Sequence, residues 1–202
     1  MVVRPNYVLV DFENVRPDSA ELLADECFRL IVFVGASQAK IPFEFVASVQ
    51  RMGCRAEYVR ISGNGPNALD FHISYYIGRL SATEPTAFFH IISKDSGFDP
   101  LIEHLRGVRS SAQRFAAIGE IPIVRVLNAR TPAQRLDVAL GRLRQMKATK
   151  PASIKTLNGT ISSLFLGRLN DDEVSAVVRG LVNRGSVSIV GNDVTYAPSV
   201  GV

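Results

Sequence analysis

The stretch FFHIISKDSGFDP, residues 88–100, indicates both a fold class and a candidate functional site. Residues 88–92 are apolar except for His90 and too few for a helix, which predicts a strand buried on both faces. Three polar side chains follow, with Gly97 among them to let the backbone turn: Ser93, Asp95 and Asp99. Ligands of an open α/β sheet bind outside the carboxyl ends of its strands, so these side chains are expected at a functional edge.

The same acids also have a purely structural interpretation. Asp95 could cap a helix predicted from Asp99 to Val108, because a carboxylate accepts hydrogen bonds from the free N–H groups of a helix start. Capping explains one acid, but it explains two acids and a serine less well. The positions of other acidic residues in the chain are needed to choose between the two interpretations.

A second short apolar segment, residues 7–10, also runs into an acid. Asp11 follows it directly, and Asn14 lies close behind. The next segments are predicted to alternate between helix and strand, at residues 17–28, 30–34, 42–52 and 55–61. This order predicts an α/β fold with a parallel sheet and right-handed crossovers.

A further acid lies behind the loop SGNGPN, residues 62–67. The helix predicted after this loop begins at Asn67 and carries Asp70 in its first turn. Asn67 and Asp70 also have the spacing of an N-cap and its partner three residues later, which needs no functional role. His72 has no other histidine near it in sequence and is expected at the surface or behind the ligands, whereas His90 is expected as a hydrogen-bonded core residue.

Four aspartates from three segments therefore lie where a strand ends or a helix begins: Asp11, Asp70, Asp95 and Asp99. They converge if the first and fourth strands are neighbours in the sheet. Clustered carboxylates repel one another unless a cation lies among them, and hard oxygen ligands favour Mg²⁺ or Mn²⁺, the ions of phosphodiester cleavage. Three polar side chains are candidates for orienting the carboxylates, water or phosphate: Asn14, Ser93 and Asn67.

Three motifs resemble the acidic motifs of the PIN-like nucleases, in particular their NYN branch: VDFEN at residues 10–14, GPNALD at 65–70 and SKDSGFD at 93–99. The resemblance covers about residues 5–127. It implies a three-layer α/β/α sandwich with a mostly parallel central sheet. It also implies a metal-dependent ribonuclease, in which the matching acids bind Mg²⁺ or Mn²⁺ and water cleaves RNA.

One position departs from the family pattern, and two rival interpretations stay open. Many NYN proteins have an aspartate where this sequence has Gly97, and Asp99 is the candidate to replace it. The enzymatic rival is a haloacid-dehalogenase-like phosphatase, but its first motif would have Glu13 as the second acid, and no lysine lies between residues 41 and 89. The other rival is a nuclease fold that has lost catalysis and binds RNA or protein.

The rest of the chain predicts a boundary near residue 150, with domains at 1–148 and 152–202. Residues 109–121 show only a short helical turn at 115–118, and a last strand is predicted at 122–127. A helix at 131–146 follows. The second domain is expected to hold helices at 156–166 and after Asn170 and a hairpin over 186–197, a winged-helix-like module for nucleic acid or protein.

Charge and composition also predict a binding partner and a cellular location. The net charge is +4: residues 1–100 carry 9 Lys and Arg against 12 Asp and Glu, whereas residues 101–202 carry 14 against 7. An acidic pocket joined to a basic surface suits an enzyme that binds cations and a phosphate backbone, so RNA is the expected partner. Free thiols at Cys27 and Cys54, and no apolar run of membrane or signal-peptide length, favour a cytoplasmic protein without membrane association. The resemblance also allows a homodimer.

Overall fold

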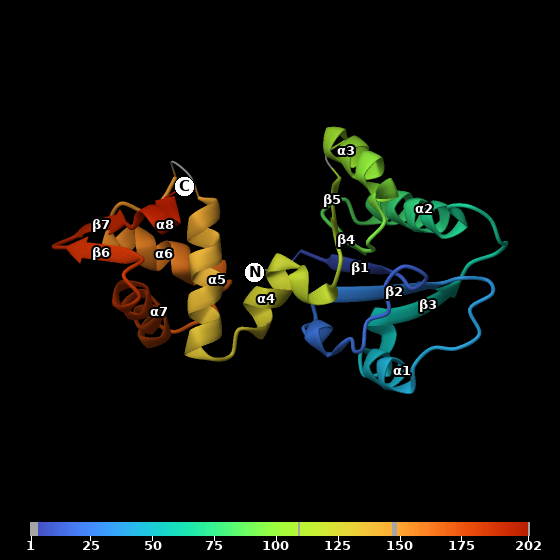
Figure 1. The fold of residues 1–202 in the computed structure, drawn as a ribbon, viewed down its shortest axis with the longest axis horizontal. Coiled ribbons are helices and arrows are strands. Elements are labelled where there is room, and N and C mark those ends of the chain that lie inside the picture. Colours follow the sequence, from blue (N-terminus) through green and yellow to red (C-terminus); the bar gives the residue numbers. More distant parts are fainter. Residues whose placement is uncertain (1–3, 109, 147–148, 202) are drawn as a thin grey trace. The chain divides into compact units, whose positions relative to one another are not determined.

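The computed structural model describes residues 4–108, 110–146 and 149–201 of the chain. It divides into two compact units, residues 1–124 and 125–202. The first unit contains a five-stranded parallel sheet in the order β3-β2-β1-β4-β5, visible in Figure 1. Its strands are β1 Asn6–Asp11, β2 Phe28–Val34, β3 Ala56–Arg60, β4 Phe88–Ile92 and β5 Ser111–Phe115.

Strand β1 lies at the centre of this sheet, paired with β2 on one side and β4 on the other. All six of its residues are buried, since side chains on both faces of a central strand are covered by helices. The first and fourth strands are therefore neighbours, as the convergence of the acids requires. Their carboxyl ends bring Asp11 and Ser93 to the same edge of the sheet.

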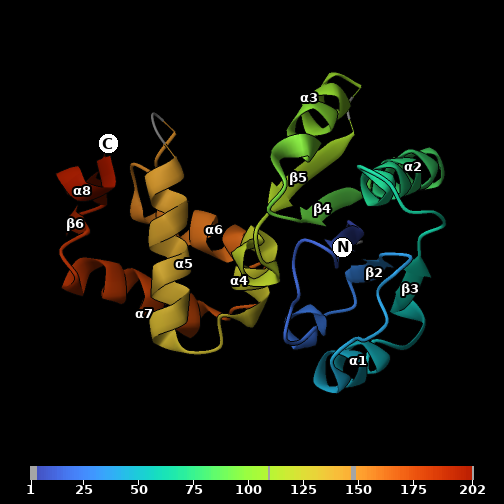
Figure 2. The ribbon, with the colours of Figure 1, turned by 45° about the vertical axis from the view of Figure 1, so that its right-hand side comes forward.

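Helices cover both faces of the sheet and complete an α/β/α sandwich. Helices α2 (Ala68–Thr83) and α3 (Asp99–Gly107) bury Ile73, Ile77 and Ile102 in one core with Leu9 and Phe89. Figures 1 and 2 show these two helices on the same side of the sheet. Helix α1 (Phe43–Gln50) lies on the opposite side, so the predicted fold class is confirmed.

The predicted helix at residues 17–28 is wrong. The segment holds only a turn of 3-10 helix, η1 Glu21–Leu23. Side chains take backbone N–H groups that a helix would have used: Ser48 Oγ accepts from the Ala20 N–H at 2.8 Å and Asp25 Oδ1 from the Cys27 N–H at 3.1 Å. Such hydrogen bonds compete with the backbone hydrogen bonds of a helix. The spacing of apolar residues does not reveal this competition.

The predicted last strand at residues 122–127 is also wrong, because these residues form helix α4 (Pro122–Asn128). The fifth strand is instead β5, in the stretch where no strand was predicted, and a 3-10 turn follows at Ile118–Glu120. Strand β5 is an edge strand whose Gln113 is exposed and whose Arg114 makes an ion pair, so it lacks an apolar run. A short apolar run such as residues 121–127 fits a helix and a strand equally well.

The second unit has its own core and consists of helices with a small antiparallel hairpin. Its further elements are α5 Pro132–Gln145, α6 Ile154–Leu164, α7 Asp171–Asn183, β6 Val187–Val190, β7 Asp193–Tyr196 and α8 Pro198–Gly201. Helix α7 begins with the predicted capping box, in which Asn170 Oδ1 accepts from the Glu173 N–H at 2.9 Å. The assignment as a winged-helix-like module stays a prediction.

The boundary between the units differs from the one expected near residue 150. Helix α5 buries Ala139, Leu140 and Leu143 in the same core as Leu157 of α6 and Val177 of α7. By its packing this helix is part of the second unit, which starts at residue 125. The short segment near residue 150 that predicted a linker is a loop inside the second unit. Residues 147 and 148, at the predicted boundary, lie outside the described residues.

Candidate metal site

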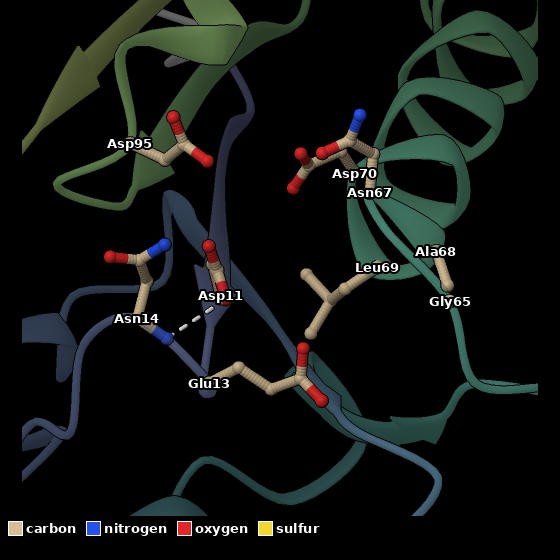
Figure 3. A pocket seen from close by; sticks show the side chains of 9 residues that line it. All are labelled: Asp11, Glu13, Asn14, Gly65, Asn67, Ala68, Leu69, Asp70 and Asp95. Atoms are coloured by element: carbon tan, nitrogen blue, oxygen red, sulfur yellow. Dashed lines mark hydrogen bonds between the residues drawn. The ribbon is translucent and has the colours of Figure 1, made fainter.

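An acidic surface pocket lies at the carboxyl edge of the sheet, where β1 ends and α2 begins. Polar and acidic side chains dominate its lining, and no lysine or arginine is among the nine lining residues: Asp11, Glu13, Asn14, Gly65, Asn67, Ala68, Leu69, Asp70 and Asp95. Figure 3 shows the carboxylates of Asp11, Asp70 and Asp95 pointing toward one shared space. Acids from all three predicted motifs thus meet in one pocket.

Asp11 is the buried base of the pocket, with 2 % of its surface exposed. Its Oδ2 accepts a hydrogen bond from Ser93 Oγ at 2.8 Å, and its Oδ1 accepts one from the Asn14 N–H at 3.1 Å. Ser93 is fully buried just after β4 and also accepts from the Asp95 N–H at 3.0 Å. The serine therefore joins the first and third acidic motifs and orients both acids, although it does not line the pocket itself.

Asp95 combines capping with a position at the pocket. Its Oδ1 accepts from the Gly97 N–H at 2.8 Å and so caps the 3-10 turn η3 (Ser96–Phe98). The sequence analysis expected this cap on the helix from Asp99, but α3 begins after Phe98 without a side-chain cap, and Asp95 caps the 3-10 turn before it. No hydrogen bond to Oδ2 is found in the described part of the chain, so this second oxygen is free to bind a cation.

Asp70 lies in the first turn of α2, opposite Asp11 and Asp95 in Figure 3. Its pKa is raised, first by burial and then by the negative charges of Asp11, Asp95 and Glu13. Asn67 precedes the helix with a left-handed backbone, φ 60°, and its side chain makes no capping hydrogen bond. The predicted capping pair is therefore wrong, and both side chains line the pocket instead.

Glu13 lines the pocket too, although the sequence analysis gave it no role in the metal site. Its side chain reaches across the end of β2, where a Cβ at position 35 would lie 1.8 Å from Glu13 Oε1. Because Gly35 has no side chain, the Glu13 side chain can lie in this position. The signal in the sequence was that Glu13 is part of the first motif, VDFEN, and that a glycine, Gly35, follows the second strand.

Asp99, the fourth predicted ligand, is not among the residues that line the pocket. Its two carboxylate oxygens accept from Arg114 Nε at 2.9 Å and from Arg114 Nη2 at 3.1 Å. This fork-shaped hydrogen bonding lowers the pKa of Asp99. Arg114 Nη1 also donates to the Ser93 carbonyl at 3.3 Å, so the pair braces the loop that carries Asp95.

Two of the three histidines, His72 and His90, lie where the sequence analysis expected them. His72 Nδ1 is 2.7 Å from the Ala68 carbonyl, and the residue does not line the pocket. His90 is buried in β4 with its Nε2 2.9 Å from Asn6 Oδ1. Neither imidazole is positioned to bind a metal in the pocket.

The fold and the pocket together define a class of protein: an α/β/α sandwich with carboxylates gathered at the edge where the first and fourth parallel strands end. A family model described as PIN domain matches residues 5–114, more than half of the chain. The chain belongs to the PIN domain family, whose members are generally metal-dependent nucleases. No curated protein and no solved structure matches the chain, and the NYN branch stays a prediction.

The donor set of the pocket suits Mg²⁺ or Mn²⁺. Carboxylate and amide oxygens are the ligands of these hard ions, and like charges that raise the pKa of Asp70 are compensated when a cation binds among them. Within the described residues, no group of three or more Asp, Glu, His or Cys side chains is arranged so that it could hold a metal ion as it stands. Mg²⁺ keeps several water ligands and needs only one or two carboxylates, so an open arrangement fits it.

Proposed function

We propose that the protein is a metal-dependent ribonuclease that hydrolyses phosphodiester bonds at the pocket of Asp11, Asp70 and Asp95. The observation that carries this proposal is the meeting of three aspartates from separate segments in one pocket whose lining holds no basic residue. A divalent cation would balance the negative charge of these carboxylates. The PIN domain family supports the same class of reaction.

Each side chain has a distinct part in this proposal. Asp11, Asp70 and Asp95 would hold Mg²⁺ or Mn²⁺, and the ion would supply an activated water and would neutralise charge on the scissile phosphate. Ser93 fixes Asp11 and the Asp95 backbone by hydrogen bonds. Asn14 and Asn67 line the pocket with amide groups that can hydrogen-bond a phosphate, and Glu13 adds a carboxylate at its rim.

The test is cleavage of labelled single-stranded RNA and DNA with Mn²⁺ or Mg²⁺, comparing wild type with Asp95→Asn. We expect metal-dependent cleavage of RNA, reduced by about a hundredfold or more in the variant, because groups that only orient ligands already cost ten- to hundredfold when lost. Asp18→Asn removes an exposed acid that does not line the pocket and serves as the matched control.

A protein that binds RNA but cleaves none of these substrates, with or without the substitution, would contradict the proposal. It would favour the alternative weighed from the sequence, a PIN domain that acts only as a binding module. Folding of each variant is checked by circular dichroism before activities are compared.

The second unit is proposed to bind nucleic acid or a protein partner, because residues 125–202 carry 11 basic against 5 acidic residues. None of the helices described by the structure has the length and apolar content of a membrane span. A cytoplasmic location and a homodimer stay proposals.

A further inference from the structure

Helix α2 carries two of the most exposed aromatic side chains of the first unit. Phe71 and Tyr75 are 70 % and 64 % exposed, although aromatic rings of this size usually bury much of their surface. They are four residues apart, so they lie on the same face of the helix, about 6 Å apart along its axis. Helix amphipathicity does not explain them, because the buried stripe of α2 is formed by Leu69, Ile73 and Ile77.

The Tyr75 ring is held in place by its neighbours. Tyr75 meets Tyr76 edge to face with ring centroids 5.8 Å apart, and Tyr76 meets the buried Phe33 in the same way at 5.1 Å. The Arg79 guanidinium lies 4.3 Å from the Tyr76 ring centroid and 6.0 Å from that of Tyr75. A ring fixed in this way loses little freedom when a ligand stacks on it.

The charged side chain of α2 from Phe71 to Arg79 is a base, Arg79. The exposed residues of α2 between Phe71 and Arg79 include no acid, and in the described part of the chain no carboxylate forms an ion pair with Arg79. An apolar and basic face of this kind suits a phosphate-bearing ligand with flat rings better than it suits an acidic or a purely apolar partner.

The face is also continuous with the acidic pocket. Asn67 and Asp70 of the same helix line the pocket, and Phe71 is the next residue in the chain. Figure 3 shows α2 entering the site with Asn67 and Asp70 at its start. A nucleic acid strand bound along α2 would lead directly to the carboxylates.

We propose that Phe71, Tyr75 and Arg79 form a stacking platform that holds single-stranded nucleic acid next to the acidic pocket. Phe71 and Tyr75 stack on consecutive bases, and Arg79 contacts the phosphate backbone. Base stacking on aromatic rings is tolerant of sequence, so the platform contributes affinity without base-specific readout. This inference rests on the proposed function of the pocket for its biological role, but binding can be measured without cleavage.

The experiment is fluorescence anisotropy of a labelled 12-nucleotide oligouridylate with the full chain in EDTA, where metal-dependent cleavage is blocked. We expect Phe71→Ala and Tyr75→Ala each to weaken binding at least about fivefold, and the double variant to weaken it further, because stacking contributes 1–3 kcal/mol per base. Phe43→Ala, which removes another highly exposed aromatic ring on α1, is the matched control and should bind like wild type.

Conservative substitutions separate stacking from general hydrophobicity. Phe71→Tyr should retain binding, whereas Phe71→Leu should lose it, because leucine keeps the apolar surface but has no ring. Thermal unfolding by circular dichroism shows whether each variant is folded. Both side chains are mostly exposed, so the variants should unfold near the wild-type temperature.

The outcomes distinguish this inference from the proposed nuclease function. Unchanged binding by the folded double variant overturns the platform, whether or not the protein cleaves RNA. Lost binding by that variant supports the platform even if the wild type cleaves nothing. A wild-type dimer that becomes a monomer on Phe71→Ala and Tyr75→Ala, with RNA binding unchanged, would show that the face joins two copies of the chain and would overturn the platform.

Discussion

His90 is a buried imidazole whose surroundings keep it neutral. Burial in β4, and to a lesser degree the positive charge of Arg4, lower its pKa from 6.5 to about 3. Its Nδ1 is buried and has no hydrogen-bond partner among the residues that the structure describes, which adds to the cost of protonation. The residue is thus a pH-sensitive part of the core and has no part in the pocket.

The shifted pKa of His90 predicts lower stability in acid. Between pH 6.5 and about 3 the unfolded chain binds a proton that the folded chain does not, so stability falls as the pH falls. The loss is on the order of 1.4 kcal/mol per pH unit in this window. Urea unfolding at pH 7, 6 and 5 measures it. The variant His90→Gln, which keeps an N–H donor for Asn6, should show a correspondingly shallower dependence, and an unchanged slope would contradict the assignment.

Asp70 links the stability of the pocket to its occupancy by metal. Since neighbouring carboxylates raise its pKa, Asp70→Asn removes repulsion, and the variant should unfold at a slightly higher temperature than wild type in EDTA. Millimolar Mn²⁺ should raise the unfolding temperature of the wild type and much less that of the variant, because an ion that binds only the folded state stabilises it. Differential scanning fluorimetry measures both effects. Equal metal-induced shifts in wild type and Asp70→Asn would place the ion elsewhere.

At the scale of secondary structure, the edge strand β5 braces the loop between β4 and α3. Arg114 of β5 holds Asp99 at the start of α3 through two hydrogen bonds and the Ser93 carbonyl through a third. Ser93 in turn binds Asp11 and the Asp95 backbone. We infer that Asp99 acts on the pocket by positioning this loop, and the ligand role expected from the sequence stays a prediction.

This bracing predicts that Arg114→Lys and Asp99→Asn have similar effects. Each loses the fork-shaped hydrogen bonding, and we expect each to lower metal-dependent cleavage by about ten- to hundredfold, as is typical of groups that orient metal ligands. The double variant should be no worse than either single one, because both remove the same contact. A Mn²⁺ titration of cleavage completes the test. A loss for Asp99→Asn far beyond that for Arg114→Lys would restore Asp99 as a ligand.

At the scale of the whole molecule, the second unit contains a complete hydrophobic core. The buried cluster that includes Leu140, Leu157, Val177 and Val194 draws only on residues 126–200. Three of its helices begin with a capping box, at Thr131, Ser153 and Asn170. Such a unit has the internal packing that an independent domain needs.

We therefore expect residues 122–202, which include all of α4, to fold when expressed alone. The fragment should show helical circular dichroism and a single cooperative urea transition. Leu157→Ala, which empties a fully buried position, should destabilise it by about 2–5 kcal/mol. A fragment without a cooperative transition would mean that this core forms only in the full chain.

The sequence by itself determined the central strands and the acids that follow them. Strands such as β1 and β4 are buried on both faces, so their apolar runs are visible without any knowledge of their neighbours. Asp11 is the last residue of β1, Asp95 lies in the loop after β4 and Asp70 lies in the first turn of α2, and sheet topology brings such positions together. The capping boxes of the second unit are also local features of the sequence, since each depends on two residues three positions apart.

The tertiary structure alone decided the features that depend on contacts between distant segments. Strand β5 forms because it pairs with the edge of β4, so its polar residues carried no strand signal. In the segment at residues 17–28, Ser48, far along the chain, accepts a hydrogen bond from the Ala20 N–H group, which a helix would have used. Asp99 faces Arg114, and Glu13 reaches the pocket. In both cases the direction of the side chain depends on residues from distant segments, which periodicity and spacing do not reveal.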